Sequence, residues 1–415
     1  MLKLNFDVKR KTLENGLEVL TIKKDTQIAS INVGIKVGAM NEEINEKGIS
    51  HFIEHMLFKG TENRDNEELN EGLEALGGEY NAYTDYDATV YTVSCLGEEI
   101  ENAINLLGDM ITSSNFKKRE LERERGVILA EIRSSKDDIE DLSFTKINDI
   151  AFDKSPLKYD VTGIEGNVKK FNRQDIVEFY KKYYVPSNCT ITIVSEMEHD
   201  KAANMIEKGF LNWSGKKIEQ TKMLQEKNKP VKKISLKSDI EQSTIIYLYT
   251  LNDLKKEDEL CFRILNHRLG ESANSMLFRE IREKRGLAYD IYTNLDISNN
   301  IKTLYIYTAV AKENIDETIS AIDDLIKNIK DGTIVIGEKD LSLMKKVHKT
   351  AVISTLEDSA ELCNYILNQE LEKEDIFEFV KDMKDLETIN MDKIQDVAKA
   401  VLNNPTIHIL TSNEE

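Results

Sequence analysis

The chain has 415 residues, of which 40% are hydrophobic and 32% carry a charge. This length exceeds what one hydrophobic core usually organises, so at least two domains are expected, and the composition excludes a disordered or fibrous protein. The formal net charge of −19 argues against binding to nucleic acid or to anionic membranes. It favours either an enzyme that attracts basic peptides or a solubility charge on a cytoplasmic protein.

The cysteines and the N-terminal residues indicate a cytoplasmic protein. The four cysteines are scattered without paired spacing, which is typical of reduced thiols and not of a disulfide framework. Residues 1–7 lack the apolar run of a signal peptide and the arginine- and serine-rich helix of a transit peptide. No window approaches about 18 continuous apolar residues, so no membrane span is predicted.

In chain order, the first half alternates strands and helices. Residues 3–38 alternate as strands do, and helices are predicted at about 47–59 and at 66–76. Residues 80–91 are rich in β-branched and aromatic residues and predict a strand or a strand pair. The remaining elements predicted for this half are helices at about 98–113, from about 117 onward and at 173–183, and a strand at 189–194.

The second half is predicted to repeat the first. Alanine–isoleucine pairs begin at Ala103 and Ala321, which are 218 residues apart, and Pro186 and Pro405 are 219 residues apart. Two anchors at nearly one offset favour a duplicated domain. The elements predicted for this half are a strand-like region at 234–250, helices at 256–269 and about 313–330, and strands at 288–296 and 303–310, with a segment at 277–285 that is not assigned to either type.

A lysine-rich, polar stretch without aromatic residues separates the two halves. Its composition is typical of an inter-domain linker. We therefore predict an N-terminal domain over residues 1–215, a linker over 216–233 and a C-terminal domain over 234–415.

The stretch from Gly48 to Thr61 carries the most specific chemical signal. His51 and His55 are four residues apart on one helix face, and Glu54 lies on the same face. Two neutral imidazoles, a carboxylate and an open position suit catalytic zinc, and a carboxylate close to the metal but not bound to it suits a general base. His-x-x-Glu-His inverts the commoner metalloprotease motif. Because it is short enough to occur by chance, the interpretation needs a third ligand elsewhere in the chain.

Glu131 is the natural candidate for that third ligand. It lies 76 residues after His55 and seven after Glu124, which is about two helical turns and almost the same face. Glu124 could then orient a histidine through its second nitrogen. Taken alone, such a glutamate pair more often belongs to a solvated, charge-rich helix. Four further histidines lack metal-ligand spacing and are assigned to structure or surface: His199, His267, His348 and His408.

Several separate motifs, in the right order, resemble the pitrilysin/insulinase-type zinc metallopeptidases. The likeness is to the short-chain branch of these inverzincins, which includes processing peptidases, and it covers essentially the whole chain. Its anchors are Gly48–Thr61, Asn81–Thr84, Glu124–Glu131 and Phe278–Tyr289.

This resemblance implies a zinc site. His51, His55 and Glu131 would bind one zinc ion per chain. Glu54 would be the general base, and Glu124 would support the ligands without touching the metal.

The resemblance also implies substrate contacts in the first half. Relatives bind substrate as an added strand along the segment that matches Asn81, Ala82, Tyr83 and Thr84. Main-chain hydrogen bonds then give affinity with little sequence preference. The alternative for residues 80–91 is an interior strand of a sheet.

In the second half, Arg282 and Tyr289 match an arginine/tyrosine pair that closes over the scissile bond. The tyrosine hydroxyl would stabilise an oxyanion and the arginine would hold substrate carbonyls. Without the resemblance, Arg282 would be read as a surface charge and Tyr289 as a core aromatic.

The fold implied is α+β, with two homologous α/β-sandwich halves that form half of a clamshell chamber. Each half would have a mixed, largely antiparallel sheet with helices on one side. The chain would hold two of the four related domains of a closed chamber, which implies a dimer. Because it carries both the zinc set and the Arg/Tyr pair, a homodimer is favoured over a heterodimer with a paralogue.

The activity expected is zinc-dependent endopeptidase hydrolysis of peptides or unfolded segments, and the acidity of the chain suggests basic ones. The alternatives are a catalytic subunit that needs a paralogous partner, a non-catalytic scaffold subunit, and a metal-storage or metal-sensing protein. A complete set of ligands and base argues against the last two, because neither needs a general base.

Overall fold

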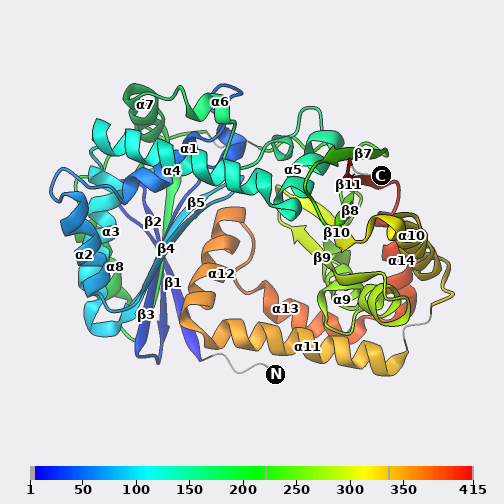
Figure 1. The fold of residues 1–415 in the computed structure, drawn as a ribbon. Helices are drawn as coiled ribbons and strands as arrows, with labels where there is room; N and C mark the ends of the chain where they lie inside the picture. Colours follow the sequence, from blue (N-terminus) through cyan, green and yellow to red (C-terminus); the bar gives the residue numbers. More distant parts are fainter. Residues whose placement is uncertain (1–4, 220–221, 335–336, 414–415) are drawn as a thin grey trace. The chain divides into compact units, whose positions relative to one another are not determined.

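The computed structural model describes residues 5–219, 222–334 and 337–413. The chain forms two compact units, each assembled from several segments (Figure 1). The first unit comprises Met1–Ile132, Tyr159–Lys222 and Ile353–Glu378, and the second comprises Arg133–Lys158, Met223–Val352 and Phe379–Glu415. The predicted linker includes residues 220 and 221, and the predicted N-terminal strand region includes residues 3 and 4; these four positions lie outside the described residues.

A six-stranded mixed sheet organises the first unit (Figure 1). Its strands are Phe6–Thr12 (β1), Glu18–Lys24 (β2), Ile28–Ile35 (β3), Glu79–Thr84 (β4), Thr89–Leu96 (β5) and Cys189–Ser195 (β6). They lie in the order β1-β2-β6-β3-β5-β4, and only the β2/β6 pair is parallel. Strands β3 and β6 are buried along nearly their whole length, because elements cover both faces of the sheet.

Helices cover one face of this sheet and enclose the first hydrophobic core. They are Ile49–Leu57 (α1), Asn66–Ala75 (α2), Ile100–Ser113 (α3), Lys118–Asp137 (α4), Glu165–Val168 (α6), Arg173–Tyr183 (α7) and His199–Gly209 (α8). The apolar side chains of β3 that face them, such as Ile31 and Val33, alternate with Ser30 and Asn32 on the opposite face.

A five-stranded mixed sheet organises the second unit. Its strands are Lys232–Lys237 (β7), Ser243–Thr250 (β8), Ala288–Ile297 (β9), Lys302–Val310 (β10) and Thr406–Ser412 (β11). They lie in the order β7-β11-β8-β10-β9. The region 234–250, predicted as a single strand-like stretch, is in fact two strands that lie on either side of β11.

The helical segments of the second half are partly irregular. They include Glu259–Asn266 (α9), His267–Glu271 (η6), Phe278–Lys284 (η7), Ile315–Asp331 (α10), Glu338–Glu357 (α11), Glu378–Asp385 (α13) and Met391–Val401 (α14). The predicted helix 256–269 is present as α9 and η6, and the unassigned segment 277–285 contains η7; both η6 and η7 are π-helical. Such widened turns are rare and often occur at functional sites.

The two sheets share one topology, which confirms the predicted duplication. In β2-β6-β3-β5-β4 and in β7-β11-β8-β10-β9 the first pair is parallel and the other pairs are antiparallel. The predicted fold class, two homologous α+β halves with mixed sheets, is therefore confirmed.

One helix from each half of the sequence packs in the unit built mainly from the other half. Ile139–Ala151 (α5) packs on β8 and β11, and Ser359–Glu372 (α12) packs on β3 and β6. Leu367 of α12 contacts the strand face at Gly34, opposite the face covered by α1 and α3. The packing units thus differ from the two halves of the sequence, and the domain boundaries drawn from the sequence stay a prediction. Among the described residues, no helix combines the length and the apolar character that a membrane span needs.

Candidate active site

The histidine motif lies on α1, whose start requires a glycine. Gly48, at the N-cap, has a φ of +102°, a conformation that side chains with a Cβ rarely adopt. A Cβ there would also lie 2.8 Å from the carbonyl oxygen of Thr162. The helix then buries Phe52 and Ile53 in the first core, so its orientation is fixed by packing.

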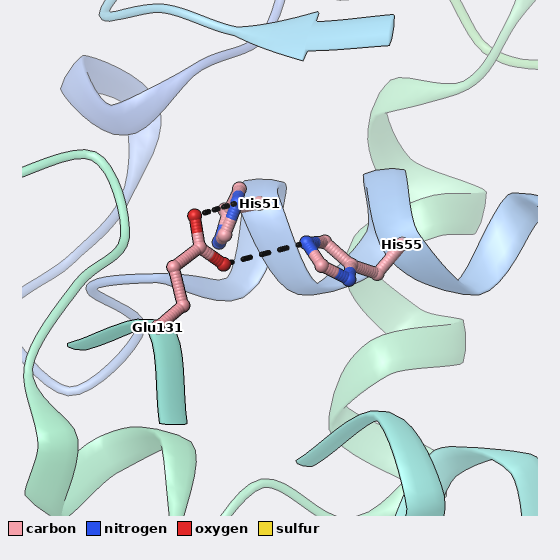
Figure 2. Close-up of side chains that lie close together, drawn as sticks. All are labelled: His51, His55 and Glu131. Atoms are coloured by element: carbon pink, nitrogen blue, oxygen red, sulfur yellow. Dashed lines mark ion pairs between the residues drawn. The ribbon is translucent and has the colours of Figure 1, made fainter. Parts of the chain in front are cut away.

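Three candidate ligands converge at this helix. Figure 2 shows the Glu131 carboxylate, from α4, with one oxygen directed to each imidazole. His51 Nε2 lies 3.7 Å from Glu131 Oε1, and His55 Nε2 lies 3.7 Å from Glu131 Oε2. One ligand atom from each residue lies within 4.8 Å of the other two.

This donor set fits a zinc ion. Ligand atoms about 2.1 Å from one tetrahedral zinc lie about 3.4 Å apart, which is close to the 3.7 Å separations between the histidines and Glu131. Two imidazoles and one carboxylate leave one of four positions open, as in catalytic zinc sites. The residues present therefore match the group that the sequence implies.

The surroundings of His51 and Glu131 shift their pKa values in ways that favour metal binding. It lowers the pKa of His51 to about 4, with a further contribution from His55, so the His51 imidazole is neutral at physiological pH, as a metal ligand must be. Burial also raises the pKa of Glu131, against the effect of His55. Even a half-buried carboxylate gains from a cation that compensates its charge.

Behind His55 lies a second carboxylate. Glu124 Oε2 lies 3.3 Å from His55 Nδ1, and Lys59 Nζ lies 3.1 Å from Glu124 Oε1. Burial would raise the pKa of Glu124, but the bonds from His55 and Lys59 outweigh it and hold that pKa below its usual value. An ionised Glu124 can accept a hydrogen bond from the Nδ1–H group of His55. In that tautomer Nε2 carries no proton and can face the ligand cluster.

Glu54 is held by the strand next to it. The Thr84 hydroxyl, at the end of β4, donates to Glu54 Oε2 at 2.6 Å. Burial raises the pKa of Glu54, and the Thr84 hydroxyl and His55 oppose this effect. Glu54 is not a member of the ligand cluster, so its carboxylate remains available for another role.

Strand β4 lies at the edge of the first sheet and carries the predicted substrate segment. The alternative of an interior strand is therefore wrong for residues 81–84, whereas residues 89–91, at the start of β5, do lie in an interior strand. Edge strands present unpaired main-chain groups to a further strand. Ala82 and Thr84 are half-buried, while Asn81 and Tyr83 are exposed on the other face, where the Tyr83 hydroxyl donates to Asn364 Oδ1 of α12 at 3.1 Å.

Comparisons with known proteins identify the family of the chain. Residues 18–164 match the model described as insulinase (peptidase family M16), and residues 170–346 match the M16 inactive domain. A zinc protease of Rickettsia felis, named as uncharacterized, is 33% identical over 316 residues, 74% of each chain. The chain belongs to the insulinase family. The zinc protease YmxG of Bacillus subtilis, also named as uncharacterized, is 27% identical over 355 residues, 85% of each chain.

Solved structures share the insulinase-family fold over nearly the whole chain. A protease from Helicobacter pylori superposes with a TM-score of 0.90 at 21% identity, covering 99% of this chain and 100% of that one. The periplasmic protease PqqL from Escherichia coli gives 0.78 at 19% identity, and this chain covers 48% of its length. Both likenesses show the fold alone.

The predicted arginine/tyrosine pair of this insulinase-family chain lies in the second unit. Arg282 is in η7 and Tyr289 is in β9. The Arg282 guanidinium carbon lies 4.6 Å from the centre of the Tyr289 ring and 4.7 Å from that of Phe278. Tyr289 is 76% exposed, so it is not the core aromatic that the sequence alone favoured. A role of the pair at the scissile bond stays a prediction.

Two contacts of the insulinase-type site have little or no signal in the sequence. Lys59, which pairs with Glu124, lies four residues after His55, and this spacing is the only local signal for it. The bond between Thr84 and Glu54 joins residues 30 positions apart. Spacing does not indicate such a bond, because it depends on β4 packing beside α1.

Proposed function

We propose that this insulinase-family chain is a zinc-dependent endopeptidase. The observation that carries the proposal is the convergence of His51, His55 and Glu131 beside a fourth side chain, Glu54, that is held in place by Thr84. The residues of the site thus separate into candidate ligands and a candidate base.

The chain's own residues divide the chemistry. A zinc ion held by the ligand cluster supplies Lewis acidity and a water nucleophile at neutral pH. Glu54 accepts the proton released during attack and returns it to the leaving amine, and the Thr84 hydroxyl orients its carboxylate. Glu124 keeps His55 in the required tautomer.

The peptide is proposed to add as a strand to the free edge of β4. That placement brings its main chain past Thr84, whose hydroxyl contacts the base. Tyr289 and Arg282 are proposed to complete the site by binding the oxyanion and the substrate carbonyls. The exposure of the Tyr289 side chain supports a role in binding.

The wider context is part of the same proposal. We propose an active homodimer that encloses peptides or unfolded segments, with a preference for basic ones because the chain carries a net charge of −19. We propose a cytoplasmic location, which accords with four buried free cysteines.

The test is cleavage of a basic, internally quenched peptide by the purified chain, with and without a zinc chelator. We expect cleavage that the chelator abolishes and added zinc restores. Glu54→Gln should keep its zinc and lose roughly a hundredfold to ten-thousandfold in kcat, His51→Ala should lose zinc, and Glu74→Gln, an exposed control on α2, should match the wild type.

Three outcomes would count against parts of the proposal. Wild-type turnover by Glu54→Gln would remove Glu54 from the mechanism, and full zinc content in His51→Ala would remove that ligand. Bound zinc without cleavage, restored by a paralogous chain, would establish a catalytic subunit that needs a partner.

A further inference from the structure

A buried glutamate that the proposed mechanism does not use closes the start of α1. Glu42 is 6% exposed. Its Oε2 accepts from the Gly48 N–H at 3.0 Å, and its Oε1 accepts from the Ser50 N–H at 2.8 Å. These N–H groups have no partner within the helix, and an anion at this end is favoured by the helix dipole.

The loop that carries Glu42 is fixed to the end of the proposed substrate strand. Within the short turn Ala39–Asn41 (η1), the Ala39 N–H donates to the carbonyl of Asp85 at 3.0 Å, and the Met40 N–H donates to the carbonyl of Tyr86 at 2.8 Å. Asp85 and Tyr86 directly follow β4. The approach is close, because a Cβ at Gly38 would lie 2.1 Å from the Asp85 carbonyl oxygen.

A second contact joins α1 to the end of β4. Glu54 accepts from Thr84, the last residue of β4. The helix is therefore tied to the end of β4 twice, through Glu42 at its first turn and through Glu54 at its middle. His51 lies one residue after Ser50 and Glu54 four residues after it, so a shift of the first turn moves both.

A lysine completes the support of this turn. Lys47 is buried, and its Nζ donates to the Ala39 carbonyl at 2.6 Å. Burial raises the pKa of Glu42 to about 7, while the bonds from Ser50 and Gly48 and the charge of Lys47 oppose the rise. A carboxylate in such a place costs desolvation energy, which two main-chain bonds and a nearby cation offset only in part.

We propose that Glu42 is a positioning residue for the active site: it fixes the first turn of α1 against the end of β4, and so sets the geometry of the histidine ligands and Glu54 relative to the bound peptide. This inference rests on the proposed zinc peptidase function. Misplacement of reacting groups by about 1 Å can cost on the order of a hundredfold in rate, even when the change lies away from the chemistry.

The experiment compares two variants with a neighbour. Glu42→Gln keeps the shape but turns an amide NH2 toward one of the two N–H donors, which leaves that donor without an acceptor. Glu42→Asp keeps the charge but shortens the arm by one methylene. Glu43→Gln is the matched control, because Glu43 is adjacent and exposed.

Three readouts are taken on the full chain: the melting temperature, the visible spectrum after replacement of the metal by Co²⁺, and kcat and KM on the quenched peptide. The Co²⁺ spectrum reports ligand geometry independently of turnover. For both Glu42 variants we expect a folded protein with an altered Co²⁺ spectrum and a kcat lowered roughly tenfold or more with little change in KM. Glu43→Gln should match the wild type in all three.

The results separate this inference from the proposed function. Folded Glu42 variants with a wild-type Co²⁺ spectrum and kcat, even if they melt earlier, would show that Glu42 only stabilises the fold. Failure of both variants to fold would equally overturn the positioning role. A wild-type chain that neither binds metal nor cleaves peptide would overturn the proposed function itself, and this inference with it.

Discussion

At the residue scale, the site places similar carboxylates in different surroundings. Glu124 is bonded by His55 and Lys59, which hold its pKa low. Among the residues that the structure describes, no lysine pairs with Glu131, which faces two imidazole nitrogens, whereas the Thr84 hydroxyl donates to Glu54. The roles proposed for them are an acceptor of a hydrogen bond from a histidine, a metal ligand and a base. These roles need different partners, and the surroundings of the three glutamates differ accordingly.

The buried residue His408 predicts how the free energy of unfolding depends on pH. His408 of β11 is 0% exposed, and its Nε2 lies 2.9 Å from Ser235 Oγ. Burial lowers the pKa of His408 from 6.5 to about 4, and the charge of Lys146 lowers it further. His408 therefore binds a proton more readily in the unfolded chain than in the folded one. Its contribution to the free energy of unfolding is fully present above pH 6.5 and is lost as the pH falls toward 4, by up to about 3 kcal/mol.

Replacement of His408 by glutamine tests this prediction. Urea unfolding midpoints should fall less steeply in His408→Gln than in the wild type between about pH 6.5 and pH 4. Above about pH 7.5 both side chains are neutral, so the difference between the proteins should be constant there. Equal steepness of the two curves in acid would contradict a neutral His408 in the folded state.

The local contacts of the site could be predicted from the sequence only where they follow helical spacing. His51, Glu54 and His55 share a face because a helix turns every 3.6 residues, and that face is present in α1. Glu42 lies only six residues from Gly48, yet its role at the first turn depends on a loop that folds back on itself. No periodic pattern encodes such a loop.

At the element scale, α5 and α12 begin with the same type of N-cap, an aspartate. The Asp138 Oδ1 accepts from the N–H groups of Glu140 and Asp141, at 2.8 and 3.0 Å. The Asp358 Oδ1 accepts from those of Ala360 and Glu361, at 2.8 and 2.9 Å. Each aspartate thus satisfies two N–H groups that the helix itself leaves unpaired.

We expect each cap to contribute a similar free energy of unfolding. Asp138→Ala and Asp358→Ala should each cost about 1 kcal/mol, and the double variant about the sum, because the two caps share no partner. Asp324→Ala, at an exposed position within α10, should change little. Denaturant midpoints measure all four proteins, and a neutral effect at either cap would show that packing alone defines the start of that helix.

The elements that could be predicted are those with strong local signals. Helix α3, helix α10 and strand β6 lie within two residues of the predicted bounds, since their apolar periodicity is clear and turn residues flank them. Helices α5, α11, α12 and α14 and strand β11 were not assigned separately. Nothing in the apolar face of α5 or α12 indicates which of two similar sheets it covers, so their exchange could not be predicted.

At the scale of the whole molecule, the duplication extends to the topology of five strands in each sheet but not to the chemistry. The strands β2-β6-β3-β5-β4 and β7-β11-β8-β10-β9 correspond, with β1 as an additional strand of the first sheet, but the motif His-x-x-Glu-His occurs only in the first half. The edge strand of each sheet carries a proposed functional segment, Asn81–Thr84 in β4 and Tyr289 in β9. One architecture thus carries candidate metal ligands in one copy and a proposed substrate pair in the other.

The exchange of helices predicts that neither half of the sequence folds alone. A fragment of residues 1–219 lacks α12 and leaves the strand face at Gly34 and Val90 uncovered. A fragment of residues 220–415 lacks α5 and uncovers Tyr305 and Tyr307, which Phe144 of α5 contacts with ring centres 5.2 and 5.9 Å apart. Exposed apolar faces of this kind bind dye and promote aggregation.

We expect each fragment, expressed separately, to bind a hydrophobic dye and to unfold without a sharp transition. Co-expression of the two fragments should yield one stable complex with the melting behaviour of the intact chain, because each then supplies the helix that the other lacks. The intact chain, cut at the linker after purification, is the control. A cooperative, dye-free melt of either fragment alone would show that its sheet does not need the exchanged helix, and the two halves would then be independent domains.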